Sequence, residues 1–166
     1  ITSLPTPWIS LLLKADVSGN WGKILSQTNF FKTDFRSNIY LQITERTRFL
    51  TAGEIGIINA SNWNKYPLSL KFFAGGPMSI RGFSYRDLGP GKYLKLLKFE
   101  GQYRVYGNIY LTAFRDMGIA TNQLKDKMQG SIGIGLMFAS KAGQLQLSIA
   151  KPDHDSTLKM QLSFNL

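Results

Sequence analysis

The feature that most constrains this chain is the alternation along its last segment, STLKMQLSFNL, residues 156–166. Apolar side chains occupy every second position from Leu158, and polar side chains lie between them. A period of two is typical of a β-strand with one apolar and one polar face. The same alternation recurs along the chain, at 97–105, 108–116, 131–138 and 144–149, with further candidates near 8–18, 34–45 and 47–58. The pattern predicts an all-β chain of eight strands, each of about 9–11 residues.

The polar faces of these strands indicate what surrounds them. They carry mostly Gln, Ser, Asn, Thr and Gly, whereas the exposed face of a soluble sandwich usually carries many charges. An aliphatic outer face and an uncharged polar inner face are typical of a transmembrane β-barrel. No apolar run approaches the roughly 18 residues of a transmembrane helix. We therefore expect an antiparallel transmembrane β-barrel.

The net charge of +10 suggests an acidic partner, and nucleic acid is the first class to consider. The basic residues are spread along the chain, so an anionic lipid or lipopolysaccharide surface, or a water-filled lumen, explains them equally well. Cysteine is absent, which excludes disulfides and thiolate chemistry.

One long insert, residues 59–93, interrupts the strands and contains FFAGGPMSIRGFSYRDLGP, residues 72–90, here called the motif loop. Glycines allow positive φ and close backbone approach, and prolines stiffen a loop. These residues are Gly75, Gly76, Gly82, Gly89, Pro77 and Pro90. The aromatic side chains expected to pack the loop are Phe72, Phe73, Phe83 and Tyr85. The composition predicts a loop that folds on itself and docks, with Arg81 projecting from its tip toward an anionic partner.

The motif loop resembles the lumen loop of the BamA/TamA superfamily of outer-membrane assembly barrels, and it is most similar to that of TamA-like members. The family core is [V/I]-R-G-[F/Y], which residues 80–83 match. TamA-like members add an upstream glycine pair and a downstream Tyr and Leu-Gly-Pro. The matching positions here are Gly75, Gly76, Ser79, Ile80, Arg81, Gly82, Phe83, Tyr85, Gly89 and Pro90.

The resemblance also implies partners for Arg81. The family places a glutamate on the strand after this loop and an aspartate, in F-x-D-x-G, on the next strand. These correspond to Glu100 and Asp116, which both fall on the polar face assigned above from alternation alone. The last strand is similar to the family's C-terminal assembly signal, and its apolar positions are Met160, Leu162, Phe164 and Leu166.

The family barrel has sixteen strands, and the motif loop joins the eleventh to the twelfth. Five expected strands follow the loop here and three precede it. The resemblance therefore implies that residues 1–166 are the C-terminal part of the barrel, with a lumenal loop at 59–93. It also implies that the N-terminal periplasmic POTRA domains are absent from this chain.

By resemblance, the protein promotes insertion or secretion of β-barrel or autotransporter proteins at the bacterial outer membrane. It would act through a lateral strand seam and an Arg81-held lumen loop, without enzymatic activity, cofactor, metal or catalytic residues. The implied partners are outer-membrane lipid or lipopolysaccharide, client outer-membrane proteins and a TamB-like periplasmic protein, but not nucleic acid.

Other readings of the sequence stay open. A two-partner-secretion exporter would pass a client through the lumen, and a passive porin would use Arg81 to line a constriction. A soluble basic β domain would bind nucleic acid. His154 lies between two aspartates, but a single histidine without further nitrogen or sulfur ligands is poor zinc chemistry, and KPDHDST, residues 151–157, indicates a hairpin turn.

Overall fold

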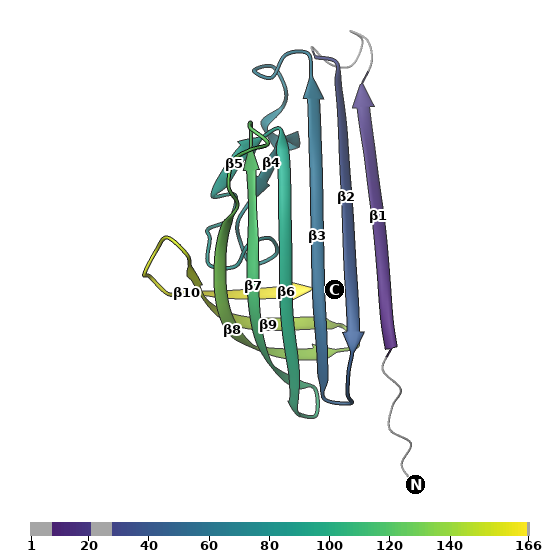
Figure 1. The fold of residues 1–166 in the computed structure, drawn as a ribbon, viewed down its shortest axis with the longest axis vertical. Coiled ribbons are helices and arrows are strands. Elements are labelled where there is room, and N and C mark those ends of the chain that lie inside the picture. Colours follow the sequence, from purple (N-terminus) through teal and green to yellow (C-terminus); the bar gives the residue numbers. More distant parts are fainter. Residues whose placement is uncertain (1–7, 21–27, 166) are drawn as a thin grey trace.

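The fold is an antiparallel sheet of eight strands that pair in the order of the chain (Figure 1). The structure is a computed structural model that describes residues 8–20 and 28–165. The strands are β1 (Trp8–Asn20), β2 (Phe30–Gln42), β3 (Thr47–Ala60), β6 (Tyr93–Tyr106), β7 (Ile109–Thr121), β8 (Gln129–Ser140), β9 (Gly143–Pro152) and β10 (Lys159–Asn165). The all-β antiparallel prediction is confirmed.

The alternation seen in the sequence becomes two faces of this sheet. In β9 the even-numbered positions from Gln146 to Pro152 are buried and the odd-numbered ones from Leu145 are exposed. The exposed face carries large apolar side chains, for example Ile134, which is 64% exposed. A contiguous apolar surface of this extent needs a cover other than water. Lipid supplies that cover in a membrane barrel, where strands point apolar residues outward and polar residues inward.

The strands are longer than predicted. β3 and β6 each have 14 residues, and β2 begins at Phe30 rather than at residue 34 and ends at Gln42 rather than at 45. The cause is pairing between distant residues, because Phe30 aligns with Ala60 and extends the ladder beyond the clearest alternation. The early end has a local cause: the Thr44 hydroxyl accepts hydrogen bonds from the N–H groups of Arg46 and Thr47, which closes the turn.

The sheet curls strongly toward its C-terminal end. In Figure 1, β1, β2 and β3 run along the long axis of the molecule, whereas β9 and β10 run across it. β1 and β10 are the two edges: within the described residues, β1 pairs with β2 alone and β10 with β9 alone. No helix in the described part of the chain is long and apolar enough to cross a membrane.

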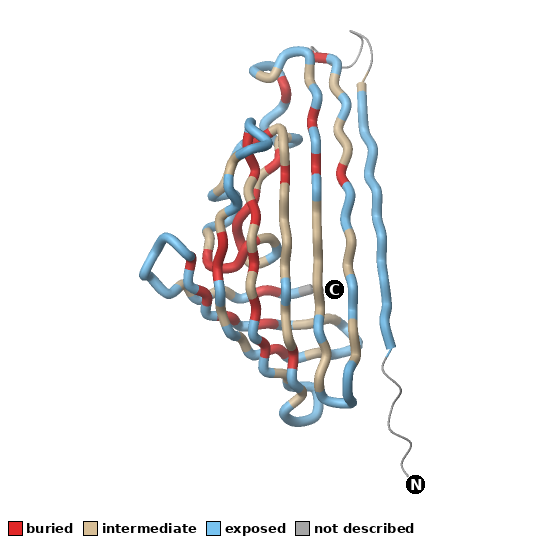
Figure 2. Tube along the Cα trace, viewed as in Figure 1, coloured by how far each residue is buried: buried red, intermediate tan, exposed pale blue. Residues whose placement is uncertain are grey.

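The insert between β3 and β6 has more regular structure than the sequence predicted. It contains a short 3-10 helix (Leu68–Leu70) and the strands β4 (Phe72–Ala74) and β5 (Leu88–Gly91), which pair into a second small sheet. Apolar side chains of the insert and of the sheet form one buried cluster. Its members are Ile58, Tyr66, Phe72, Ala74, Ile80, Leu94 and Ala120. Figure 2 shows buried residues, in red, along the insert and the strands on the inner side of the curl. This cluster fixes the insert against β3, β6 and β7.

Gly91 marks the closest approach between the insert and the sheet. A Cβ at this position would overlap backbone atoms of Ala120 and Thr121, which cannot move as a side chain can. We expect Gly91→Ala to lower the free energy of unfolding by about 1–3 kcal/mol, measured by urea unfolding in lipid vesicles. Gly101→Ala is the control, because its Cβ would meet only the Phe49 ring at 3.2 Å, and that ring can rotate away. Equal stability of both variants would contradict the close packing at Gly91.

Candidate functional site

The tip of the motif loop is folded on itself by its own backbone. Gly76 N–H donates to the carbonyl oxygen of Phe83 (3.1 Å), and Ser79 N–H donates to the carbonyl oxygen of Gly76 (3.0 Å). Gly75, Gly76 and Gly82 have φ values of +103°, +99° and +88°, a region that L side chains rarely adopt. The glycines of the motif therefore permit a tight turn that a chain with side chains at these positions would resist.

Arg81 extends from this turn to the inner face of the sheet, where its side chain is buried. Its guanidinium makes a two-pronged contact with Asp116 on β7: Nε donates to Oδ2 (2.7 Å) and Nη2 to Oδ1 (2.8 Å). The backbone N–H of Arg81 also donates to Asp116 Oδ2 (3.1 Å). Nη1 donates to Glu100 Oε2 on β6. We call Arg81, Glu100 and Asp116 the ion cluster.

The ion cluster is almost closed to solvent. The side chains of Arg81, Glu100 and Asp116 are 4%, 12% and 0% exposed. Burial alone lowers the pKa of Arg81, but hydrogen bonds and charge from Asp116, together with those from Glu100, outweigh it and raise that pKa. Removing one partner of a buried ion pair leaves the other charge buried and unpaired. The loss of one partner therefore lowers the free energy of unfolding by roughly 3–5 kcal/mol.

Further inner-face side chains complete the surroundings of the ion cluster. The Phe114 ring centroid lies 3.4 Å from the guanidinium carbon of Arg81, which adds a cation–π contact. Gln146 Nε2 donates to Thr112 Oγ1 (3.0 Å) and to Glu100 Oε2 (3.4 Å). These residues sit on the polar faces that alternation predicted, but no spacing rule indicated that they would meet around Arg81.

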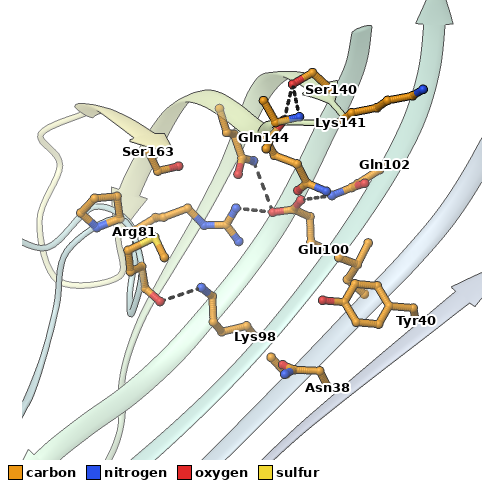
Figure 3. A pocket seen from close by; sticks show the side chains of 17 residues that line it. Asn38, Tyr40, Arg81, Lys98, Glu100, Gln102, Ser140, Lys141, Gln144 and Ser163 are labelled. Atoms are coloured by element: carbon orange, nitrogen blue, oxygen red, sulfur yellow. Dashed lines mark hydrogen bonds and ion pairs between the residues drawn. The ribbon is translucent and has the colours of Figure 1, made fainter. Parts of the chain in front are cut away.

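A polar cavity of about 740 Å³ opens beside the ion cluster (Figure 3). It lies between the tip of the motif loop, the inner faces of β2, β3 and β6, and the turn from β8 to β9. Figure 3 shows Lys98 reaching the loop, where its Nζ donates to the carbonyl oxygen of Met78 (3.1 Å). Lys98 thus binds the loop from β6, and the loop occupies space on the inner side of the sheet.

The loop tip also touches the last three strands. Gly82 packs on small side chains: a Cβ there would lie 3.1 Å from the Cβ of Ala150 and 3.4 Å from that of Ser131. Gly82 N–H donates to Gln161 Oε1 (2.9 Å), and Gln161 Nε2 donates to the carbonyl oxygen of Phe83 (2.7 Å). Alternation placed Gln161 on the polar face of the last strand, but nothing in the sequence indicated its contact with the motif loop.

The structure corrects one expectation about the motif loop. Tyr85 does not pack the loop interior, since its side chain is 80% exposed and lies beside the exposed Arg86. Phe72, which was expected to pack the loop, does so: it is buried, and a Cβ on Gly56 would overlap its ring. Gly89 and Pro90 lie in β5, so they serve the small sheet rather than the tip.

The apolar positions of the last strand point outward. Met160, Leu162 and Phe164 are 70%, 62% and 57% exposed. Leu166, the last position of the predicted assembly signal, lies outside the described residues. His154 lies in the exposed turn before β10, and no group of three or more His, Cys, Asp or Glu residues within 8–20 and 28–165 is placed to hold a metal ion.

An apolar outer face, a polar inner face and a loop folded against the inner face together define the wall of a membrane-embedded β-barrel. The chain belongs to the Omp85 superfamily, since the family model for the Omp85 superfamily domain matches residues 2–166. Members of this superfamily are outer-membrane proteins, and the superfamily acts in the insertion or secretion of proteins at that membrane.

Proposed function

We propose that this chain is part of a TamA-like assembly barrel that helps β-barrel or autotransporter proteins enter the bacterial outer membrane. The observation that carries the proposal is the Arg81 contact with two neighbouring strands, because Asp116 and Glu100 hold the loop tip from β7 and β6. A loop held in this way braces the inner wall and fills space that an open pore would leave to water.

The working surface of the proposed protein is an edge of its sheet. Backbone N–H and C=O groups along an unpaired strand edge can pair with an incoming strand. β1 and β10 provide such edges in the described part of the chain. We propose that further strands of a sixteen-stranded barrel pair with β1, and that the seam for client strands lies along β10.

The proposed mechanism uses hydrogen bonding and apolar burial alone, so it involves no enzymatic step and no cofactor. Its partners are client outer-membrane proteins and the surrounding lipid or lipopolysaccharide. A TamB-like periplasmic protein would attach through POTRA domains, and nucleic acid is not among the partners. Tyr85 and the sequence Leu88-Gly89-Pro90 support the TamA-like assignment over a two-partner-secretion exporter.

The proposal predicts client-dependent activity. In liposomes containing the full-length protein, we expect an autotransporter or small β-barrel client to become protease-resistant and folded several times faster than in liposomes without it. Single-channel recordings of the same preparation separate the alternatives. A steady, large conductance with no effect on client folding would overturn the proposal in favour of a porin. Export of a soluble client into the vesicle lumen, without membrane insertion, would favour the exporter.

A further inference from the structure

Gln161 is the one side chain of β10 whose hydrogen bonds with the motif loop are described. Its amide accepts from Gly82 N–H (2.9 Å) and donates to the carbonyl oxygen of Phe83 (2.7 Å), so it binds the backbone of two consecutive residues of the loop. Gly82 and Phe83 lie 79 and 78 positions before Gln161 in the chain. The amide therefore joins the loop tip directly to the strand at the edge of the sheet.

β10 is the strand on which such a contact has the largest effect. It has 7 residues, whereas β9 has 10 and the remaining six strands of the sheet have 12–14. Its ladder runs from Lys159 to Asn165 on β9, and its other edge has no partner strand in the described residues. A short strand paired on one side has few backbone hydrogen bonds to hold it, so two side-chain bonds form a large share of the total.

The loop tip brings this contact next to the ion cluster. Arg81 is bound to Glu100 and Asp116, and Gly82, the next residue, is bound to Gln161. The backbone N–H of Arg81 also donates to Asp116 Oδ2 (3.1 Å). Consecutive Cα atoms are about 3.8 Å apart, so a movement that takes the Arg81 backbone away from Asp116 also displaces Gly82. Gly82 also lies close to Ala150 and Ser131, which restricts the directions in which the tip can move.

We propose that Gln161 is a positioning residue that couples docking of the motif loop to the pairing state of the terminal strand. With Arg81 in the ion cluster, Gln161 holds β10 to the docked loop tip. When the loop leaves, β10 loses two hydrogen bonds and separates more readily from β9. Coupling of this kind is reciprocal, so a strand that pairs with β10 and shifts Gln161 would in turn weaken the docking of Arg81.

The consequence for client assembly rests on the proposed function, but the coupling itself does not. Hydrogen exchange of the full-length protein in lipid nanodiscs measures the coupling without any client. We expect Gln161→Met to increase the exchange rate of the β10 amides by about tenfold, because two hydrogen bonds to that strand are lost. We expect Arg81→Ala to increase the rate at the same amides, although Arg81 donates no described hydrogen bond to β10. In the double variant the increase should be less than the product of the two separate increases.

The matched control is Gln144→Met. Gln144 lies on the inner side of β9 opposite Asn165 and lines the polar cavity beside the ion cluster, and its amide is in none of the described hydrogen bonds that hold the loop. It should leave β10 exchange within about twofold of the wild-type rate. Gln161→Asn, which remains polar but is one methylene shorter, provides the same comparison if Gln161→Met does not fold.

The result that overturns the coupling is acceleration at Gly82 alone, with β10 exchange unchanged in the Gln161 and Arg81 variants. Gln161 would then satisfy two loop backbone groups and nothing more. A fully multiplicative double variant would also overturn it. If β10 exchange responds as expected while client folding is unaffected by every variant, the coupling stands and the assembly function proposed above fails.

Discussion

Replacing Arg81 by alanine is expected to lower the free energy of unfolding by roughly 3–5 kcal/mol and to abolish most client assembly. The substitution removes one cation and leaves Asp116, whose side chain is fully buried, without the guanidinium that pairs with both of its oxygens. Urea unfolding in lipid vesicles measures the stability, and protease resistance of a folded client measures the activity. Arg81→Lys should recover only part of the stability and part of the client assembly, because an ammonium cannot reproduce the two-pronged contact.

Arg86→Ala is the control for this experiment. Arg86 belongs to the same loop and also lies over an aromatic ring, 4.0 Å from the Phe73 centroid, but it is exposed. An exposed cation–π contact contributes about 0.5–1 kcal/mol, so this variant should stay near wild type. Equal client assembly by the Arg81 and Arg86 variants would show that the ion cluster has no role in activity.

The second large effect is expected at Asp116. Asp116→Ala alone should lower the free energy of unfolding by roughly 3–5 kcal/mol, since it leaves a buried guanidinium with Glu100 as its single acidic partner. Combining it with Arg81→Ala should cost less than the sum of the two, with a coupling of about 1–3 kcal/mol. Glu100→Ala should also couple to Arg81→Ala, but more weakly, because Glu100 is somewhat more exposed and receives only one guanidinium hydrogen bond. Urea unfolding of the wild type and of each single and double variant gives the free energies of unfolding for this double-mutant cycle.

The exposed turn after β9 supplies a comparison pair for this double-mutant cycle. Arg115 and Asp153 also form a two-pronged contact, at 2.6 Å for both hydrogen bonds, but their side chains are 38% and 34% exposed. Solvent screening limits the coupling of such a pair to about 1 kcal/mol or less. Strict additivity at Arg81 and Asp116, or a coupling no larger than that of Arg115 and Asp153, would count against a tight ion cluster in the folded protein.

The face on which a side chain lies and the position of a turn depend on near neighbours in the chain, and both were predictable from the sequence. Alternation assigned Glu100 and Asp116 to the inner face, and the structure places both there, in contact with Arg81. The break between the predicted strands 97–105 and 108–116 coincides with the observed turn, since β6 ends at Tyr106 and β7 begins at Ile109. These features follow from local geometry, because successive Cβ atoms of a strand point to opposite faces.

Alternation along the chain settled that the protein is all-β, where its strands lie and which of their side chains share a face. It could not settle the length of β2, the exposure of Tyr85, the small sheet of β4 and β5, or the contact of Gln161 with Gly82. Each of those depends on which distant segments pair and on the space left between them. A side chain's face follows from its own backbone, whereas its partner follows from the packing of the whole sheet against the insert.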